Sequence, residues 1–229
     1  MPDRRVPGRP SATVLASRPT IDPDGIREAA LRLFAQFGYR STTMADIGAA
    51  LGIRGPSLYK HVGSKQDLLV QIMVGTMNAL IEDQYTARTA GGDITTQLRR
   101  MVEAHVRFHA LNSEQAFVGN REIGNLEQPH LDRVLALRAL YERGLRDAVA
   151  EGIDTGALTT ADPRLASYAV LDMGIGVATW FGPDGPRTAD QVAYAYADFA
   201  LAIFGAVDAG AQRGATAATP RGRARPPAR

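Results

Sequence analysis

Apolar residues recur along most of the chain at the three- and four-residue spacing of an amphipathic helix. The first stripe begins at Ile26 and ends at Phe37, as expected of a helix that packs one face on a core. Pro23 suits the first turn of that helix, where its missing N–H removes no hydrogen bond, and Gly38 suits its end. The pattern therefore predicts a helix between Pro23 and Gly38.

Two further helices are predicted by residue pairs that cap helix starts. In TTMADIGAAL, Thr43 stands three residues before Asp46, which is the spacing of a capping box, and the apolar face that follows ends at Gly52. In GSKQDLLVQIMVGTMNALI, Ser64 stands three residues before Asp67 in the same way. With the first helix and a short one in between, four helix starts fall within about 65 residues.

The rest of the chain has the same helical periodicity in longer runs. Breaks such as EGIDTG and FGPDGPRT separate these runs, and no alternation typical of strands competes with them. We find no internal repeat. The pattern predicts an all-α fold, with a small N-terminal helical module followed by a larger bundle. The runs of the bundle cover residues 94–111, 115–124, 129–151, 163–181 and 188–208.

The stretch IRGPSLYKHV, residues 53–62, places two helix breakers in front of a polar and basic cluster. Its position after the preceding helix and a short turn is the spacing of a helix-turn-helix, in which the second helix enters the major groove of DNA. Pro56 suits the first turn of that helix, and Gly55 lets the backbone approach a phosphate closely. We expect Leu58 and Val62 to face the core and the polar side chains to face DNA.

The formal net charge of +2 hides an uneven distribution. Residues 1–65 hold ten basic and five acidic side chains, for +5; residues 66–206 hold eleven and eighteen, for −7; residues 207–229 hold five and one, for +4. The basic N-terminal part favours a polyanion as its partner, whereas the acidic middle would repel phosphate. Basic tails that only keep the protein in solution are the alternative.

Composition and missing motifs exclude several classes of protein. No apolar run approaches the roughly 20 residues that span a bilayer, and the N-terminus has no apolar signal-peptide core, so we expect a cytoplasmic protein with no membrane partner. The absence of cysteine excludes disulfides, thiolate nucleophiles and cysteine zinc sites. No metalloprotease, hydrolase or phosphate-loop motif occurs, so we expect neither an enzyme nor a cofactor. A non-specific nucleic-acid binder that uses the arginine-rich tails is a further alternative.

The 44 residues from Ile26 to Leu69, IREAALRLFAQFGYRSTTMADIGAALGIRGPSLYKHVGSKQDLL, resemble the DNA-binding region of the TetR family of transcriptional repressors. The resemblance implies a homodimer that binds a palindromic operator in double-stranded DNA. It also implies an N-terminal three-helix DNA-binding domain, a connecting fourth helix, and a C-terminal bundle with a ligand pocket and the dimer interface. The expected division is a disordered basic arm over residues 1–20, a helix-turn-helix domain over 21–68, a ligand-binding and dimerisation domain over 69–209, and a disordered basic tail over 210–229.

The resemblance also assigns DNA contacts to matching positions. Thr42 and Thr43, at the start of the second helix, are expected to bind phosphate, as helix N-termini with hydroxyls do. Tyr59 and Lys65 are expected to hold the DNA backbone, and Lys60 to read O6 and N7 of guanine. The expected groove-facing surface consists of Gly55, Pro56, Ser57, Lys60 and His61.

Two positions depart from the family's pattern, and some assignments have alternatives. Arg54 stands where the family often has a capping Ser or Thr, so the helix start loses a cap and the arginine is expected to reach DNA instead. Val62 replaces a frequent Phe, which affects only local packing. The alternative for Tyr59 is that its side chain is buried in the core and does not contact DNA. The side chain of His61 contacts a base, a phosphate or neither. The N-terminal arm has two possible roles. Its arginines enter a minor groove of DNA, or the arm is a disordered tail in solvent. These arginines are Arg4, Arg5, Arg9 and Arg18.

The runs at 163–181 and 188–208 are rich in small residues and apolar on faces wider than one buried stripe needs. We expect these two helices to form the dimer interface, packed with the copies of a second chain as a four-helix bundle. Gly174, Gly176 and Ala178 would allow the helices to approach closely there.

A ligand pocket is expected among the helices from about 94 to 151 and the helix that ends at Trp180, because an apolar cavity with a few polar groups is the usual ligand site. For each aromatic candidate, the alternative is that the side chain packs in the hydrophobic core and does not contact a ligand. His105 and His109 have the i, i+4 spacing of metal ligands, but no third ligand is evident, so we expect no metal. The candidates are His105, Phe108, His109, Phe117, Arg121, Tyr141 and Trp180.

The ending TWFGPDGPRTADQVAYAYADFAL is similar to that of many actinobacterial TetR members, some of which respond to acyl-CoA thioesters or other lipid metabolites. No basic residue stands between Arg164 and Arg187 to meet the phosphates of CoA, which favours a simpler hydrophobic ligand such as a lipid or a drug. We expect a lipophilic effector that releases the repressor from DNA. The helix fixed by Leu68 and Leu69 is the expected lever.

Overall fold

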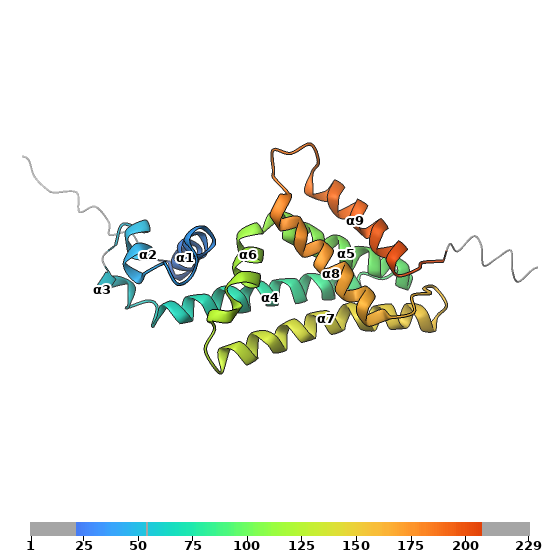
Figure 1. Cartoon of the computed structure of the whole chain (residues 1–229), viewed down its shortest axis with the longest axis horizontal. Helices are drawn as coiled ribbons and strands as arrows, with labels where there is room; N and C mark the ends of the chain where they lie inside the picture. Colours follow the sequence, from blue (N-terminus) through green and yellow to red (C-terminus); the bar gives the residue numbers. More distant parts are fainter. Residues whose placement is uncertain (1–21, 54, 208–229) are drawn as a thin grey trace, which may run out of the picture.

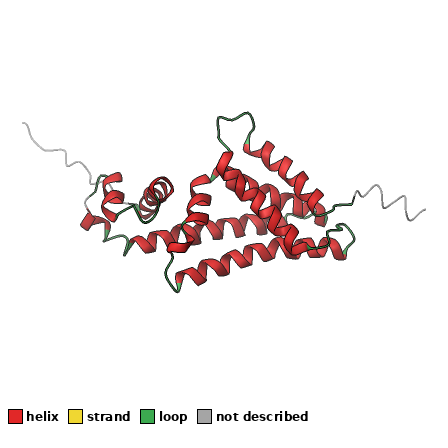
Figure 2. Ribbon diagram, viewed as in Figure 1, coloured by secondary structure: helices red, strands yellow, loops and turns green. Residues whose placement is uncertain are grey.

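A computed structural model of the protein describes residues 22–53 and 55–207. Throughout this part every regular element is a helix, and loops join the helices (Figure 2), which confirms the predicted all-α fold. The expected basic arm with its arginines, the expected basic tail, and Arg54 lie outside the described residues. No helix of the described part combines the length and the apolarity needed to cross a bilayer.

Three short helices form the N-terminal module: α1 (Pro23–Phe37), α2 (Met44–Ala50) and α3 (Gly55–Leu58). As predicted, Pro23 takes the first position of α1, and Gly38 follows its last residue with a φ of 84° that glycine adopts without strain. The predicted capping box of α2 is also present. The Thr43 N–H donates to the Asp46 carboxylate at 2.8 Å, and the Asp46 N–H donates to the Thr43 hydroxyl at 3.1 Å.

The remaining helices form a larger bundle: α4 (Lys65–Thr89), α5 (Ile94–Leu111), α6 (Ser113–Arg121), the 3-10 turn η1 (Ile123–Asn125), α7 (His130–Asp154), α8 (Pro163–Trp180) and α9 (Ala189–Ile203). α5 is the central helix and packs against α4, α8 and α9, while α4 and α7 lie side by side (Figure 1). On α5, Leu98 and Val106 are fully buried, and Val177 of α8 and Ala193 of α9 are fully buried in the same core. One apolar stripe on α5 therefore organises the bundle.

α4 runs through two hydrophobic cores. Leu68 and Leu69 in its first turns are fully buried with Phe34 of α1 in the core of the N-terminal module. Met77 and Leu80, further along α4, belong to the core of the bundle. Because burying a leucine side chain stabilises a fold by about 1.5–3 kcal/mol, the first turns and the middle of α4 are each firmly attached to a core.

α6 connects the N-terminal module with the bundle. Val118 on α6 is fully buried in the core of the module. Just beyond α6, the Asn125 side-chain oxygen accepts a hydrogen bond from Arg40 Nε at 2.7 Å, and the Asn125 carbonyl accepts one from Gln66 Nε2 at 2.9 Å. α6 therefore lies between α1 and α8 (Figure 1) and is held on the side of the module by both packing and hydrogen bonds.

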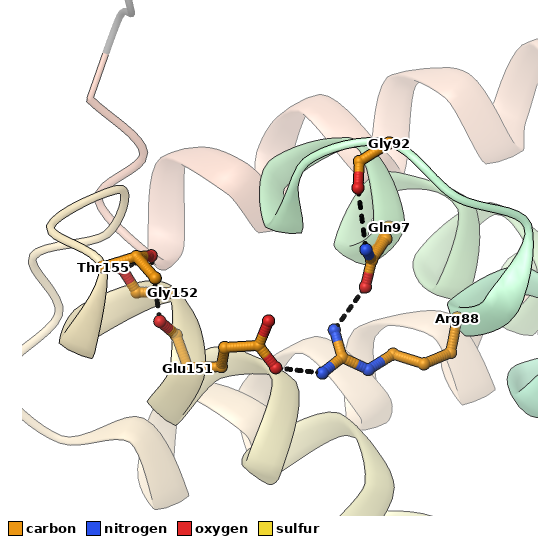
Figure 3. Close-up of polar contacts among 6 residues, drawn as sticks. All are labelled: Arg88, Gly92, Gln97, Glu151, Gly152 and Thr155. Carbon is orange, nitrogen blue, oxygen red and sulfur yellow. Dashed lines mark hydrogen bonds and ion pairs between the residues drawn. The ribbon is translucent and has the colours of Figure 1, made fainter.

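A polar network ties three helices together at the far end of α4 (Figure 3). Arg88 of α4 donates to the Gln97 side chain of α5 at 2.5 Å and forms an ion pair with Glu151 of α7. Gln97 donates to the Gly92 carbonyl at 2.8 Å, and the Thr155 hydroxyl donates to the Glu151 carbonyl at 2.9 Å. Since Arg88 and Glu151 are partly exposed, their ion pair adds at most about 1 kcal/mol, and its main effect is to fix the helix ends.

α9 ends at Ile203, earlier than the apolar run over 188–208 predicts. Gly205 has a φ of 67°, and the chain turns there so that the Phe204 carbonyl accepts a hydrogen bond from the Thr159 N–H at 3.2 Å. Phe204 is fully buried in the bundle core although it lies outside the helix. The apolar pattern therefore continues beyond the point where the helical backbone stops.

Gly174 lets α8 approach α5 closely. A Cβ at this position would lie 2.2 Å from Cδ2 and 2.5 Å from Nε2 of His105. The expectation that Gly174 serves contacts between subunits is therefore wrong, because the residue is buried against a helix of its own chain. At Gly176 an added Cβ would meet nothing within 4 Å.

We expect Gly174→Ala to lower the free energy of unfolding by about 1–3 kcal/mol, because the added methyl group displaces His105 in a packed core. Gly75→Ala is the matched control. Gly75 is exposed in the middle of α4, and a Cβ there would meet nothing within 4 Å, so this change should raise stability by up to about 1 kcal/mol. Urea unfolding followed by circular dichroism measures both variants, and equal stabilities would contradict the close approach.

Candidate DNA-binding surface and ligand cavity

The helix-turn-helix of α2 and α3 has one apolar side and one polar side. Leu58 is fully buried and Val62 is 5% exposed, as predicted, and both lie in the core of the N-terminal module. Tyr59 is 56% exposed, and Lys60 and His61 are exposed next to it. The alternative that placed Tyr59 in the core is therefore wrong, and three side chains capable of hydrogen bonds to DNA stand together on the surface.

α3 is a single helical turn, shorter than the sequence predicted, and its path continues as hydrogen-bonded turns. The N–H groups of His61 and Val62 donate to the Leu58 carbonyl at 3.0 and 3.1 Å. This arrangement keeps the backbone compact up to Val62. Ser57 is half-buried, so only part of its surface is open to solvent.

A tight turn joins α2 to α3. The Ile53 N–H donates to the Gly48 carbonyl at 2.9 Å, which brings the chain back over the end of α2. α3 begins at Gly55, where the sequence predicted its start. Arg54 lies outside the described residues, and the exposure of Gly55 and Pro56 is not described, so the DNA contacts of all three stay predictions.

Thr42 and Thr43 differ in role although they are adjacent. Thr42 is 2% exposed, and its hydroxyl donates to the Gly38 carbonyl at 2.9 Å. The predicted phosphate contact of Thr42 is therefore wrong, because the side chain fixes the turn between α1 and α2 instead. Thr43 is exposed, but its hydroxyl donates to the Asp46 carboxylate at 2.6 Å. The hydrogen bonds from Thr43 lower the pKa of Asp46, so a negative charge already occupies this helix start.

Lys65 at the start of α4 binds the protein's own backbone. Its ammonium group donates to the carbonyl oxygens of Tyr39 at 2.8 Å and Thr42 at 2.7 Å, and it lies 4.3 Å from the centre of the Tyr39 ring. Two of its three N–H donors are thus used inside the module. Lys65 is only half-buried and keeps one N–H free, so its contact with the DNA backbone stays a prediction beside this internal role.

A cavity of about 190 Å³ lies between α4, α5, α6, α7 and α8. Among the seven sequence candidates, it brings together His105, His109 and Tyr141. Its apolar walls come from α4 and α8, and include Met77, Leu80, Leu171 and Ile175. Its polar lining also includes residues that the sequence analysis missed, namely Gln115, Asn120, Arg138, Glu142, Tyr168 and Asp172.

His105 is a neutral, fully hydrogen-bonded residue at the inner wall of this cavity. Its Nδ1 lies 2.9 Å from the Tyr141 hydroxyl, and its Nε2 lies 3.0 Å from the Leu171 carbonyl. A carbonyl only accepts, so Nε2 carries the proton and Nδ1 accepts from the tyrosine hydroxyl. Burial lowers the pKa of His105 to about 4, although the bond to the Leu171 carbonyl opposes the shift.

His109 lies one turn further along α5 and has an unsatisfied nitrogen. Its ring centre is 4.6 Å from that of His105, and the side chain is only 4% exposed. Its Nδ1 is buried and has no hydrogen-bond partner. Burial, and the nearby His105, lower its pKa to about 3, so His109 is neutral at physiological pH. A buried polar atom without a partner in a cavity wall is suited to bind a ligand.

The other four ligand candidates lie outside this cavity. Trp180 is 54% exposed, because α8 ends at the surface there, and its expected place in the pocket is therefore wrong. Arg121 is exposed and stacks on Phe117, with its guanidinium carbon 4.3 Å from the ring centre, in a neighbouring hollow. Phe108 faces a larger hollow of about 550 Å³ between α1, α4 and α5. Exposed, paired charges line part of that hollow, so it suits an apolar ligand less well.

The histidine pair gives no support for a metal site. Both nitrogens of His105 are already hydrogen-bonded to Tyr141 and Leu171. Within residues 22–53 and 55–207, no group of three or more His, Cys, Asp or Glu side chains is placed to hold a metal ion.

Acid should destabilise the bundle through His105 and His109. Both imidazoles have a lowered pKa when folded but return to about 6.5 when unfolded, so the unfolded chain takes up protons first as the pH falls. Their stabilising effect is complete above about pH 6.5 and is lost as the pH falls toward 4. Between pH 7 and 5 the expected loss is about 2 kcal/mol for each histidine. In urea unfolding, His109→Phe should reduce the total loss by about half, and an unchanged loss would contradict the shifted pKa.

Two family profiles match the chain over the regions that carry these sites. The profile described as "Bacterial regulatory proteins, tetR family" matches residues 26–72, from α1 into α4. The profile described as "Tetracyclin repressor-like, C-terminal domain" matches residues 91–204, from α5 through α9. The exposed helix-turn-helix and most of the cavity lining therefore fall within matched segments.

Individual relatives agree with the profiles. The transcriptional repressor KstR2 of Rhodococcus jostii is 30% identical over 181 residues, which are 76% of this chain and 86% of that protein. The fold is shared with the ketosteroid transcriptional regulator KstR2 of Mycobacterium tuberculosis, at a TM-score of 0.74 and 24% identity over 82% of this chain and 97% of the other. The fold is also shared with AibR, whose structure was solved in complex with isovaleryl coenzyme A and operator DNA. The TM-score is 0.71 and the identity is 24%, over 81% of this chain and 99% of AibR. The protein therefore belongs to the TetR family of helix-turn-helix transcriptional regulators, which bind DNA and are not enzymes.

Proposed function

We propose that the protein is a repressor that binds a palindromic operator as a homodimer, and that a lipophilic small molecule in the cavity releases it. The observation that carries this proposal is the position of α6. Ala116 and Gly119 of α6 line the cavity, while Val118 on another side of the same helix is buried in the core of the DNA-binding module. A ligand that moves α6 also moves part of that core.

The proposed release is a shift between two populations of the dimer. Two recognition helices must stand about 34 Å apart to enter successive major grooves of one face of DNA. A ligand favours release only if it binds more tightly to a dimer with another spacing. α4 also transmits a displacement of the bundle to the module, because it is buried in both cores. α6 is the more direct link, because Val118 and, just beyond the helix, Asn125 contact the module.

The proposed DNA contacts divide between the sugar-phosphate backbone and the bases. Tyr59 holds the backbone, and Lys60 reads guanine from the major groove, with His61 next to it. Ser57 and Thr43 contact DNA only through the parts of their side chains that are open to solvent. The DNA-binding domain covers residues 21–68, the ligand-binding and dimerisation domain covers 69–209, and the basic segments over 1–20 and 210–229 flank them.

The proposed dimer interface is the outer face of α8 and α9. Trp180 lies 6.4 Å, between ring centres, from Tyr196, which lies 5.9 Å from Phe199. Large side chains on this face are exposed, including Leu165 at 64%, Phe199 at 54% and Trp180 at 54%. Exposed large apolar side chains on two helices are typical of a surface that a second copy covers, and in the proposed dimer two helices from each copy form a four-helix bundle.

The effector is proposed to be lipophilic because leucine, isoleucine and methionine side chains form much of the cavity wall. One fold relative is named a ketosteroid regulator, and ketosteroids are apolar; another was solved with isovaleryl coenzyme A, whose isovaleryl group is a short branched apolar chain. A regulator of transcription works where the chromosomal DNA lies, so the proposal includes a cytoplasmic location.

A non-specific DNA binder is the competing function, and point variants separate it from the proposal. Tyr59→Ala should weaken binding to operator and random DNA alike, because it removes a backbone contact. Lys60→Ala should cost the operator about 1–3 kcal/mol more than random DNA, because it removes base recognition. Arg143→Ala, an exposed cation on α7, is the matched control and should change neither affinity. Fluorescence anisotropy over a salt series measures all four proteins, and equal affinity of the wild type for both DNAs would exclude the repressor.

Phe199→Asp should prevent dimerisation, because it places a charge in the proposed apolar interface. Tyr85→Asp is the matched control, since Tyr85 is 68% exposed on α4, away from α8 and α9. Sedimentation velocity should show a dimer for the wild type and the control and a monomer for Phe199→Asp. The emission of Trp180, the single tryptophan, should shift to shorter wavelength on dimerisation. A wild-type protein that stays monomeric at every concentration would refute the interface.

A further inference from the structure

One cationic group in the cavity wall has no counter-charge. Arg138 of α7 is half-buried, and its Nη2 donates to the Gly119 carbonyl of α6 at 2.6 Å. Arg138 forms no ion pair with any carboxylate of the described residues. Burial lowers its pKa from the ordinary range, but an arginine keeps its charge at any physiological pH. A charge that is partly removed from water gains most from an anionic partner.

The acidic groups of the cavity are engaged or exposed. Glu142, one turn beyond Arg138, forms an ion pair with Arg146 at 3.2 Å. Asp172 of α8 is exposed, so water screens its charge. The Tyr168 hydroxyl accepts a hydrogen bond from Arg164 at 3.2 Å. The guanidinium of Arg138 is therefore the one half-buried charge in the described cavity wall that lacks a protein counter-ion.

A second polar group of the cavity is also unsatisfied. Nδ1 of His109 is buried without a hydrogen-bond partner, and the side chain is 96% removed from solvent, since only 4% of it is exposed. A neutral imidazole carries its proton on either nitrogen, so Nδ1 is able to donate to an acceptor oxygen. The residues that line the cavity thus include a forked cation and a neutral imidazole with an unused nitrogen, and both groups suit an anion with oxygen acceptors.

The volume of the cavity limits the size of the ligand. A closed apolar cavity of about 150 Å³ in a protein holds one benzene molecule. The cavity here measures about 190 Å³, so it accepts an apolar body of roughly the same size with one small polar group. The cavity is partly open to solvent, so the rest of a long acyl chain or of a CoA thioester would have to extend out of it.

We propose that the effector is a small monocarboxylic acid, with its carboxylate on Arg138 and its aromatic or branched apolar body between α4 and α8. This inference rests on the proposed function and narrows its effector from lipophilic molecules in general to one class. Planar carboxylates match the two parallel N–H groups of a guanidinium, which a neutral amide or an amine cannot do. Binding also competes for the guanidinium that now holds the Gly119 carbonyl of α6, which connects recognition of the acid to the helix that contacts the DNA-binding module.

Matched ligands test this inference. Calorimetric titration of the full-length protein would use benzoate, cyclohexanecarboxylate and isovalerate, each next to its primary amide and its amine of the same carbon skeleton. At least one acid should bind about 10- to 100-fold more tightly than its amide, and its amine should bind more weakly still. Equal or tighter binding of the amides or the amines, or no binding of any acid at millimolar concentration, would overturn the carboxylate assignment.

Variants of Arg138 test the residue itself. Arg138→Gln should abolish the preference for acid over amide, whereas Arg138→Lys should keep the preference but weaken acid binding, because it retains the charge and loses the fork. Arg133→Gln, an exposed cation on the same helix, is the control and should bind like the wild type. Circular dichroism shows whether each variant folds. If Arg138→Gln is unfolded, the lysine variant still decides, because unchanged acid affinity in Arg138→Lys would overturn the inference.

Operator release separates this inference from the proposed function. The bound acid should lower the affinity of the wild type for its operator fragment in the same anisotropy assay. If neutral amides release DNA as well as the acids do, the carboxylate assignment fails and the repressor function stands. If the wild type shows no preference for any promoter fragment over random DNA, the proposed function fails, whichever ligands bind.

Discussion

The burial of one helix in two places is the constraint on which the rest of the structure depends. Val118 of α6 belongs to the core of the DNA-binding module, while neighbouring residues of α6 line the cavity of the bundle. Close-packed cores resist small continuous deformation and change between discrete arrangements instead. Under the proposed function, a ligand that displaces the short α6 would therefore also disturb the core of the module, with no separate hinge.

The fold was predictable from sequence because its signals are local. Capping pairs such as Thr43 with Asp46, and breakers such as Pro23 and Gly38, act within one helical turn, and the structure places helix starts and ends where they predicted them. The inward positions of Leu58 and Val62 followed from periodicity in the same way. The end of α9 was missed because burial of Phe204 continues beyond the last helical residue.

The sites were less predictable because they combine distant segments. Arg138, Gln115 and Tyr168 line the cavity from three different helices, and no spacing within one helix indicates that they meet. Trp180 was misplaced because an aromatic residue at a helix end fits a pocket and a surface equally well in sequence. Thr42 was assigned to DNA from the family resemblance, whereas its buried hydroxyl donates to the Gly38 carbonyl; Lys65 has internal hydrogen bonds that the resemblance did not indicate.

The internal bonds of Lys65 bear on which substitutions its position tolerates. The two backbone carbonyls converge on one compact ammonium group beside the Tyr39 ring. An arginine has a wider, planar guanidinium group whose N–H donors point in fixed directions. It therefore cannot donate to both carbonyls from one position as the lysine ammonium group does. A lysine next to a DNA-reading helix can thus serve the geometry of the fold as well as a contact with DNA. The positive charge at this position therefore does not by itself identify a contact with nucleic acid.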